Sequence, residues 1–492
     1  MTTSTRTLII GTGFAGVGLG TKLKRSGDDD FLIVDRSNDV GGTWRDNRYP
    51  GAACDVPSHL YSFSFRLKSD WSRVFSPATE IWEYVVETAR DEGLMPHIRL
   101  GCELISADWN DETQRWLVTT TGGDFDCQVL VTAMGHLADG KYPNIPGLKD
   151  FTGHLMHSAQ WDHSVDLTGK RIAVIGSGAS AIQITPAMGD IAGELVVFQR
   201  TAPYVIPRPD RAYTDAEKRM FARSPEMMEE LRSEVFWGLE YNYAQRRGMP
   251  RAIAEAYAMA NGHRNNQVTD PELNAKLTPD YEIGCKRVLI SDVYYPTFAK
   301  SHVTLEASAL ERVEGNTVFS ADGNSYEVDA IVCATGFEAI EPPFAPLIHG
   351  KDGQTLAGHW DQGMQAYQSI TVPGFPNLFI TNGPNTGLGH NSVLFVVESQ
   401  IEHIQQALRY LEESDASSLE ALPQAEEGYL DWVRHRSEGT VWLDGGCSNL
   451  YVDPRTNRLT VTWPDYAYAF RTVNGDFTPE SYNSLVAGGA CA

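Results

Sequence analysis

The chain opens with a regular succession of apolar and polar positions. An apolar run, RTLIIG (6–11), leads into GTGFAG (11–16), a segment with helical spacing (17–27) and a second apolar run, FLIVD (31–35). Short apolar runs bounded by turn residues predict buried strands, and a helical segment between two strands is typical of a parallel crossover. The pattern therefore predicts strand, tight turn, helix and strand, the beginning of an α/β fold.

The turn between the first predicted strand and helix has G-x-G-x-x-G spacing. Gly11 suits the tight turn, Gly13 lets the backbone approach a pyrophosphate, and Gly16 lets helix and strand pack closely. The helix N-terminus offers free N–H groups and a positive dipole end to phosphates, and we place Phe14 of this turn among the cofactor-binding residues. Asp35 can bind ribose hydroxyls, so the first site predicts FAD or, as a second choice, NAD.

The same order recurs 165 residues later, in RIAVIG (171–176), GSGASA (176–181) and ELVVFQR (194–200). The repeat differs in one charge, because Arg200 stands where the first unit has Asp35. An arginine there favours a 2′-phosphate and hence NADP, whereas the alternative is a solvated arginine at a strand end. The other residues that we expect to bind NADP here are Gly176, Ser177, Gly178, Ala179, Ser180 and Gln183.

Two dinucleotide sites in one chain are typical of electron transfer between a nicotinamide and a flavin. We therefore predict an α/β fold with two Rossmann-like domains, for FAD and NADP, and a helical insert where the apolar spacing becomes helical. Five aromatic or long apolar residues of the insert are expected in its core: Trp237, Tyr241, Tyr243, Tyr257 and Met259. The predicted bounds are 1–141 and 338–492 for the FAD domain, 142–208 (with a linker) and 286–337 for the NADP domain, and 209–285 for the insert.

The composition of the chain argues against several classes of binding partner. The net charge of −24 makes nucleic acid and anionic lipid surfaces poor electrostatic partners. Seven cysteines without a C-x-x-C pair predict reduced thiols and no zinc ribbon. No apolar run reaches the roughly 18 residues that span a bilayer, and no secretory signal is present. We expect a cytoplasmic protein without membrane or nucleic-acid partners.

Several segments carry longer patterns. GGTW (41–44) is followed by YPG (49–51) and Asp55, and residues 151–162 read F-x-G-x-x-x-H-x-x-x-W-D. Together with VFQRT (197–201), GCKRVLISDVYYPTF (284–298) and CATGF (333–337), they resemble the class B flavoprotein monooxygenases and, within them, the Baeyer–Villiger monooxygenases. The second pattern matches the family fingerprint at every fixed position: Phe151, Gly153, His157, Trp161 and Asp162.

The resemblance implies roles for individual residues. Arg287 is similar to the active-site arginine that faces the flavin, and Asp55 to the carboxylate that orients it. Lys286, Arg200 and Thr201 resemble the clamp on the 2′-phosphate of NADPH. A guanidinium is always charged and can hold an anion, while a neighbouring carboxylate limits the cost of burying it. The residues implied to contact the flavin are Gly42, Thr43, Trp44, Asp55 and Tyr61.

The resemblance also implies a reaction. We expect an FAD-dependent, NADPH-consuming monooxygenase that inserts one oxygen atom from O2 next to a ketone carbonyl. The product is an ester or lactone, formed through a C4a-peroxyflavin, with side activity on thioethers. The alternatives are a flavin monooxygenase that oxidises nitrogen or sulfur, and a non-catalytic NADPH-binding redox sensor. A disulfide reductase needs a cysteine pair near the first unit, where Cys54 has no partner in the sequence.

The fingerprint segment also has the composition of a metal site. His154 and His157 are three residues apart, and His163 and Asp162 follow. No helical pattern places both histidines on one face, so we expect no metal. We interpret the segment as a link between the two dinucleotide units, with His157 and Trp161 as hinge-packing residues.

One segment departs from the family pattern. Relatives often have a tryptophan before the tyrosine of a GCSxWY-like segment, close to the nicotinamide ribose. This chain reads GGCSNLY (445–451), with Leu450 at that position. Leucine cannot donate a side-chain hydrogen bond, which leaves open whether the nearby Trp442 contacts NADP instead.

Overall fold

An eight-stranded sheet forms the first unit of the protein in a computed structural model that describes residues 2–486. Its strands are β1 (Thr3–Ile10), β2 (Phe31–Asp35), β3 (Ile98–Leu100), β4 (Leu104–Asn110), β5 (Arg115–Thr120), β6 (Gly123–Thr132), β17 (Ile348–His349) and β18 (Leu378–Ile380). They follow the order β17-β4-β5-β6-β1-β2-β3, with β18 beside β6. β1 pairs in parallel with both β2 and β6, as the first predicted unit requires.

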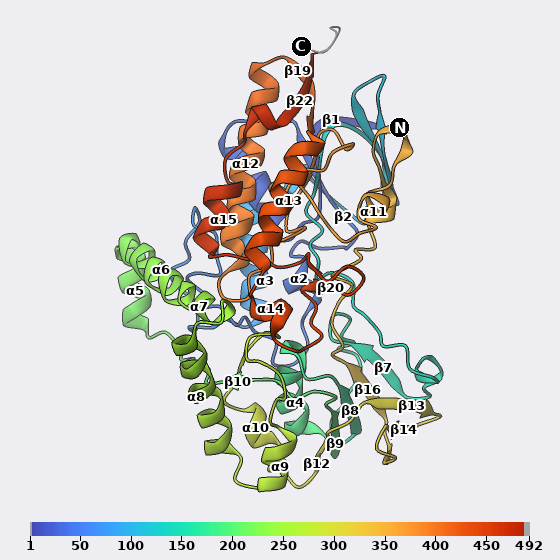
Figure 1. The fold of residues 1–492 in the computed structure, drawn as a ribbon, viewed down its shortest axis with the longest axis vertical. Helices are drawn as coiled ribbons and strands as arrows, with labels where there is room; N and C mark the ends of the chain where they lie inside the picture. Colours follow the sequence, from blue (N-terminus) through green and yellow to red (C-terminus); the bar gives the residue numbers. More distant parts are fainter. Residues whose placement is uncertain (1, 487–492) are drawn as a thin grey trace.

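Helices from both ends of the chain cover this sheet (Figure 1). They are α1 (Phe14–Arg25), α2 (Thr43–Asp46), α3 (Ala78–Asp91), α11 (Leu356–His359), α12 (Val393–Glu413), α13 (Pro423–Ser437), α14 (Val441–Asp444) and α15 (Ala467–Asn474). One buried cluster joins Ile9 of β1, Val17 of α1 and Ile401 of α12. The C-terminal part of the chain therefore returns to the N-terminal sheet, and its strand β19 (Ala416–Ala421) pairs with β22 (Tyr482–Val486).

A parallel five-stranded sheet forms the second unit. Its order is β12 (Val303–Glu306), β9 (Glu194–Phe198), β8 (Arg171–Ile175), β16 (Ala330–Cys333) and β7 (His154–His157). Helix α4 (Ala179–Ile191) follows β8, so the second predicted strand–turn–helix–strand unit is also present. A separate three-stranded antiparallel sheet comprises β13 (Leu310–Glu314), β14 (Thr317–Ser320) and β15 (Ser325–Glu327).

Strand β7 corrects one expectation. We interpreted the stretch around His154 and His157 as a link between units, but residues 154–157 form the edge strand of the second sheet, paired with β16. The two histidines are an odd number of positions apart, so a strand sends their side chains to opposite faces. His154 is exposed, whereas His157 is fully buried. Within residues 2–486, no three His, Cys, Asp or Glu side chains gather in a way that could hold a metal ion.

The segment predicted to be helical forms five helices. They are α5 (Asp215–Arg223), α6 (Pro225–Glu240), α7 (Tyr243–Arg246), α8 (Pro250–Gln267) and α9 (Pro271–Lys276). Phe221, Met228 and Phe236 join the apolar core of the first unit. Helix α8 lies against β10 (Val205–Ile206), which pairs with β11 (Leu289–Ile290) before α10 (Tyr294–Thr297). The insert therefore spans both units (Figure 1).

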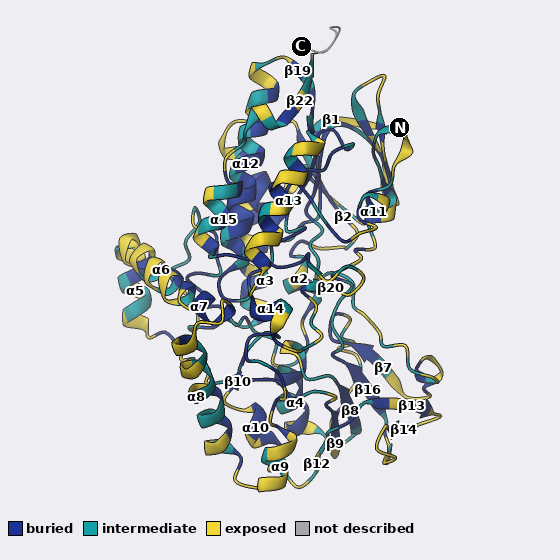
Figure 2. Cartoon of the chain, in the orientation of Figure 1, coloured by how far each residue is buried: buried dark blue, intermediate teal, exposed yellow. Residues whose placement is uncertain are grey.

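The expectation that five aromatic or long apolar residues of the insert form its core is wrong for three of them. Trp237, Tyr241 and Met259 are more than half exposed, whereas Tyr243 is buried and Tyr257 is half-buried. The outer faces of α5 and α6 are exposed in Figure 2, in contrast to the buried sheets. These helices turn apolar side chains outward because only one face of each meets the body of the protein.

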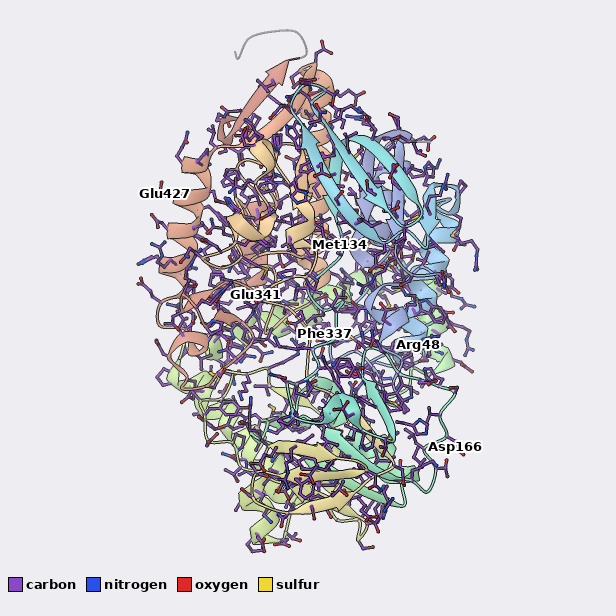
Figure 3. All side chains as sticks on the ribbon, turned by 90° about the vertical axis from the view of Figure 1, so that its right-hand side faces the viewer. Arg48, Met134, Asp166, Phe337, Glu341 and Glu427 are labelled. Atoms are coloured by element: carbon purple, nitrogen blue, oxygen red, sulfur yellow. A yellow bond between two sulfur atoms is a disulfide. The ribbon has the colours of Figure 1, made fainter. Side chains whose placement is uncertain are left out.

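Two segments connect the units, and they run side by side. Gly140 bridges Phe337, and backbone hydrogen bonds join Lys141 N to Gly336 O at 2.8 Å and Glu338 N to Asp139 O at 3.0 Å. Figure 3 shows Phe337 between the upper and lower parts of the molecule. Any movement of one unit relative to the other must bend this antiparallel pair.

The cysteines depart from the expectation of reduced thiols throughout. Cys285 and Cys447 form a disulfide, with their Cα atoms 6.2 Å apart. The pair was missed because 162 residues separate the partners, and only the fold brings their loops together; Glu282 N donates to Gly445 O at 3.1 Å beside it. The other described cysteines, Cys54, Cys102, Cys127 and Cys333, are free and buried, and Cys491 lies outside the described residues.

No helix in the described part of the chain has both the length and the apolar character that crossing a bilayer requires.

Candidate active site

The first cavity, of about 230 Å³, lies where β1 meets the N-terminus of α1. Eight of the residues predicted to bind the flavin line it: Gly11, Gly13, Phe14, Asp35, Gly42, Thr43, Trp44 and Tyr61. Trp44 Nε1 donates to the hydroxyl of Tyr61 at 3.2 Å, which fixes the two aromatic rings of the wall. Gly16 and Asp55 lie outside this lining.

Glycines shape the cradle of the first cavity. Gly11 has φ +117°, and a Cβ there would lie 2.4 Å from the carbonyl oxygen of Ala133. A Cβ on Gly16 would lie 1.9 Å from the carbonyl oxygen of Gly11, so strand and helix meet only because Gly16 has no side chain. A Cβ on Gly42 would lie 2.8 Å from Gly13 Cα. This glycine-walled turn at a helix N-terminus fits the phosphates of a dinucleotide.

Asp35 lies at the end of β2 and is held in place by three neighbours that the sequence did not indicate. Its Oδ2 accepts hydrogen bonds from Thr12 N at 2.8 Å and Thr12 Oγ1 at 2.7 Å, and its Oδ1 lies 3.4 Å from Arg45 Nη1. Oδ1 also accepts a hydrogen bond from Ser37 N at 2.9 Å, so neighbouring groups already occupy the usual acceptor positions of the carboxylate. Asp35 still lines the cavity, and a ribose hydroxyl that binds it would share or replace one of these donors.

Parts of the first cavity come from segments that sequence reasoning did not assign. Met134 and His136 follow β6, and Asn382 follows β18. Burial lowers the pKa of His136, whose Nδ1 lies 3.0 Å from Asn382 O. Figure 3 shows Met134 at the lower edge of the first unit. The sequence contained a signal for these residues, because they follow strands. Parallel strands place their carboxyl ends at one edge of the sheet, where α/β folds bind ligands.

The second glycine turn repeats the geometry of the first. Gly176 has φ +128°, and a Cβ there would lie 2.3 Å from the carbonyl oxygen of Ala334. Gly178 and Ala179 are exposed at the start of α4, where the free N–H groups point outward. Ser177 Oγ donates to Thr201 O at 2.7 Å, which ties the turn to the end of β9.

Arg200, Thr201 and Lys286 gather beside this turn. Burial lowers the pKa of Lys286, and the positive charge of Arg200 lowers it further. The ammonium of Lys286 lies 5.0 Å from the centre of the Tyr281 ring. The two cations repel each other, and an anion such as a phosphate group would relieve that repulsion.

Gln183 and Ser180, both predicted to bind NADP, also touch the first unit. The Gln183 amide donates to Ala53 O at 2.9 Å and accepts from the Tyr49 hydroxyl at 2.9 Å. Burial raises the pKa of Tyr49 to about 12, while a hydrogen bond with Ser180 opposes the rise. Helix α4 is therefore tied directly to the loop that carries Asp55.

Asp55 and Arg287 form the central ion pair between the units. Both Nε and Nη2 of Arg287 lie 2.7 Å from Oδ2 of Asp55, and Nη1 donates to Leu388 O at 3.4 Å. The charge of Asp55 raises the pKa of Arg287 despite the opposing effect of burial. About a third of each side chain remains exposed, so the guanidinium is fixed in place and still open to a ligand.

Arg287 and Asp55 line a second cavity of about 270 Å³. The insert closes one side with Tyr241, Gln245 and Arg246, and the turn before α12 adds Gly389, His390 and Asn391. Sequence reasoning missed these residues, because no motif connects the insert to the C-terminal turn. Ser392 caps α12, and the side chains of His390 and Asn391 both bind Glu240.

His157 of the fingerprint packs on both connecting segments. Its ring centre lies 5.3 Å from that of Tyr142 and 5.9 Å from that of Phe337, and a Cβ on Gly140 would lie 2.4 Å from its Nδ1. Burial lowers its pKa, so the ring is neutral near pH 7. The hinge-packing role expected of His157 stays a prediction, and the residue lies on a strand.

The other fingerprint residues fix the segment locally. A Cβ on Gly153 would lie 2.4 Å from Asp329 O and 2.7 Å from the buried Phe151 ring. Trp161 packs on the core of the second unit. Asp162 is exposed and accepts hydrogen bonds from the hydroxyl and N–H of Ser164, which lower its pKa. None of the four lines either cavity.

The segment that departs from the family pattern has an exposed leucine and a buried tryptophan. Leu450 is 48% exposed, and Trp442 is 2% exposed. Trp442 packs behind Gly389, whose Cβ would lie 3.2 Å from its ring, and no hydrogen-bond partner within residues 2–486 reaches its Nε1. Neither residue lines the two cavities described above.

Comparison with known proteins identifies the family. Residues 4–348 match the family model described as flavin-binding monooxygenase-like. The chain belongs to the flavin-binding monooxygenase-like family. A Baeyer–Villiger monooxygenase of Streptomyces coelicolor is 43% identical over 468 residues, covering 95% of this chain and 90% of that protein. One from Pseudomonas aeruginosa is 39% identical, covering 96% and 90%. The resemblance inferred from the sequence is confirmed, and this monooxygenase family member is an enzyme.

Solved structures of monooxygenases share the whole fold of this family member. Cyclohexanone monooxygenase from Rhodococcus sp. Phi1 bound to NADP⁺ superposes with a TM-score of 0.88 at 25% identity, covering 99% of this chain and 100% of that one. An oxidised steroid monooxygenase bound to NADP gives 0.85 at 28% identity, covering 98% and 100%. The predicted α/β fold is confirmed, and the cofactors named for these neighbours and the flavin-binding family agree with the expected FAD and NADP.

Proposed function

We propose that this flavin monooxygenase uses FAD, NADPH and O2 to insert one oxygen atom next to a ketone carbonyl, giving an ester or lactone. The Asp55–Arg287 pair at the wall of the second cavity is the observation that carries the proposal. When bound, the flavin supplies the oxygen-activating chemistry, by way of the C4a-peroxyflavin that the family resemblance implies. The named relatives are Baeyer–Villiger monooxygenases, which supports a carbonyl-directed reaction.

The residues of this chain would divide the work as follows. The glycine turn and Asp35 hold FAD, and the second glycine turn with Arg200, Thr201 and Lys286 holds NADPH. Arg287 supplies a permanent positive charge for an anionic oxygen species, and Asp55 keeps that guanidinium in one orientation. The buried, neutral Cys54 takes no part, because burial raises its pKa. We also propose that the chain is divided into a two-part FAD domain, a two-part NADP domain and a helical insert.

Ketones are proposed as the main substrates and thioethers as secondary ones. A nucleophilic oxygen attacks a carbonyl, whereas oxidation of sulfur or nitrogen needs an electrophilic oxygen. Because the paired Arg287 stabilises negative charge, it favours the carbonyl reaction over the heteroatom reaction. An NADPH-driven oxygen-uptake assay with product mass analysis, on linear, cyclic and aryl ketones and on thioethers, tests this. Products from thioethers or amines alone, or no substrate-stimulated uptake at all, would contradict it.

Arg200→Ala is expected to remove a preference for NADPH over NADH. Arg200 and Lys286 form the cationic site beside the second glycine turn, and a charged hydrogen bond to phosphate contributes roughly 1.5–3 kcal/mol, or about 10- to 100-fold. The measurement is the ratio of kcat/KM for flavin reduction by NADPH and by NADH. Arg312→Ala, an exposed arginine paired with Glu311 and Glu314, serves as control and should keep the ratio. Equal use of both nucleotides by the unchanged protein would refute the 2′-phosphate site.

His157→Ala is expected to keep flavin bound but to uncouple the reaction. The ring packs against both connecting segments, so its loss leaves a cavity where the units must hold their relative position. The expected result is more hydrogen peroxide per NADPH consumed and less oxygenated product. His154→Ala, three residues earlier on the same strand but exposed, should behave like the unchanged protein. Loss of FAD from His157→Ala would point to a structural role instead.

A further inference from the structure

A second arginine lines the cavity that contains Arg287. Arg246 is the last residue of α7 in the insert, and it is 4% exposed. Its Nη2 donates to Gly389 O at 2.8 Å, and Nη1 of Arg287 donates to Leu388 O at 3.4 Å. Two successive carbonyl groups of one turn therefore hold the two guanidinium groups in the same part of the cavity.

The charge of Arg246 has no carboxylate partner within ion-pair distance among the described residues. Asp55 pairs with Arg287, and Glu255, also in the cavity wall, pairs with Arg251 at 2.8 Å. Burial, opposed by Tyr451 and reinforced by the positive charge of Arg287, lowers the pKa of Arg246 to about 10. The guanidinium is still charged near pH 7, so the cavity carries a cation that its own carboxylates do not neutralise.

The carboxylate of Glu240, which also lies near this turn, already has a full set of hydrogen-bond donors. Glu240 accepts hydrogen bonds from His390 Nε2 at 3.1 Å, Asn391 Nδ2 at 2.7 Å, Ala467 N at 3.1 Å and Tyr468 N at 3.3 Å. Burial lowers the pKa of His390, so this ring contributes no positive charge near neutral pH. Among these groups, Asp55 pairs with Arg287, Glu240 keeps its negative charge but is held by its own hydrogen bonds, and Arg246 has no ion-pair partner in the described part of the chain.

Arg246 also has unused donors and space around it. It donates through Nη1 to Gln245 and through Nη2 to Gly389, and its Nε has no partner, so three of its five N–H groups remain free. A Cβ on Gly284 would lie 2.8 Å from Nη1, and one on Gly389 would lie 3.5 Å from Nε. Two glycines therefore make room for a buried cation whose hydrogen bonding is incomplete, which is costly unless a ligand completes it.

We propose that Arg246 binds a carboxylate on the substrate, so that the preferred substrates are ketones that carry an acidic group. This inference rests on the proposed ketone oxidation, since Arg246 and Arg287 share one cavity. The guanidinium forms two parallel hydrogen bonds with a carboxylate, which fixes distance and orientation together. A keto acid whose carboxylate is bound by Arg246 has its ketone carbonyl in the same cavity as Arg287. The distance between the two arginines then selects the chain length between the carboxylate and the ketone.

The test compares a keto acid with its methyl ester on one carbon skeleton. The holoenzyme is expected to show a kcat/KM roughly 10- to 100-fold higher for the acid, the range for a hydrogen-bonded charged group. In Arg246→Met the acid-to-ester ratio should fall to about one, and Arg246→Lys should keep part of it. Arg434→Met, which changes an exposed arginine of α13 that pairs with Asp431 outside the cavity, should keep the full ratio.

Binding measurements separate this inference from the proposed function. Calorimetric titration of the keto acid into oxidised, NADP-loaded holoenzyme should give a dissociation constant that Arg246→Met weakens by a similar factor. If no ketone is oxidised, the proposed reaction fails while the titration still decides the carboxylate site. Equal turnover of acid and ester by the unchanged protein overturns the inference alone, as does an Arg246→Met effect confined to the KM for NADPH. If Arg246→Met loses its flavin, the acid-to-ester ratios of kcat/KM in the unchanged protein and in Arg246→Lys decide whether the inference holds.

Discussion

The Arg287→Ala variant is expected to retain its flavin and to form esters at least about 100-fold more slowly than the unchanged protein. Arg287 does not line the first cavity, so its loss leaves the flavin cradle intact. It does line the second, where it is the cation held by Asp55. Removal of one preorganised donor from a site where negative charge develops costs roughly 100- to 1,000-fold in rate. The variant also leaves the Asp55 carboxylate without a partner, so that a negative charge remains where an anion must form.

Two measurements check this expectation. Flavin content is read from absorbance after purification, and ester formation is followed by mass analysis with saturating NADPH. Arg211→Ala is the matched control, because Arg211 forms an exposed ion pair with Glu217 at 2.6 Å, and such pairs contribute about 1 kcal/mol or less. Ester formation at the unchanged rate in Arg287→Ala would remove its catalytic role, and loss of flavin would make that role structural.

Arg287→Lys refines the same experiment. Lysine keeps the positive charge but lacks the rigid fork through which Nε and Nη2 both reach Asp55. An intermediate rate is expected if orientation matters as well as charge. A rate equal to that of Arg287→Ala would mean that orientation dominates, and an unchanged rate would mean that charge alone suffices.

The two dinucleotide units were predictable because their signals are local. Gly11 and Gly176 each adopt positive φ against a carbonyl of a neighbouring strand end, Ala133 O and Ala334 O, and the sequence repeats this arrangement with constant spacing. Asp55 and Arg287 are 232 positions apart, and no periodicity connects them. They were paired through the family resemblance, and the structure brings them within hydrogen-bond distance.

The features that sequence reasoning missed depend on contacts between distant segments. Arg246 and Gly389 meet because the insert folds over the turn before α12. Neither segment contains a motif that predicts contact with the other. The Cys285–Cys447 disulfide is of the same kind. Strand β7 was missed because HLMH (154–157) is too short for its period to be read, and its strand state comes from pairing with β16. Trp237 and Tyr241 were misplaced because apolar spacing cannot show which helix faces lack a neighbour.

Gly16→Ala is expected to yield protein without bound FAD. The new Cβ would lie 1.9 Å from the carbonyl oxygen of Gly11, which is backbone and cannot rotate away. Helix α1 must therefore move off strand β1, and its N-terminal N–H groups move with it. Overpacking of this kind costs about 1–3 kcal/mol or more, and the displaced helix terminus loses phosphate contacts besides. Absorbance at the flavin bands and the melting temperature, measured with and without added FAD, report the two effects.

Two companion variants separate binding from folding. A Cβ on Gly13 would meet Gly42 Cα at 3.7 Å, an ordinary contact, so Gly13→Ala should fold and melt normally while its flavin affinity falls. Gly428→Ala, in α13 with no atom near the new methyl group, should keep FAD and gain roughly 0.5–1 kcal/mol of stability. A Gly16→Ala protein that retains FAD would show that β1 and α1 tolerate a wider spacing, and the close packing at Gly16 would then be no requirement for the cofactor. Loss of FAD in Gly16→Ala and weaker FAD binding in Gly13→Ala, with a normal melting temperature in the latter, would place the requirement in the turn itself.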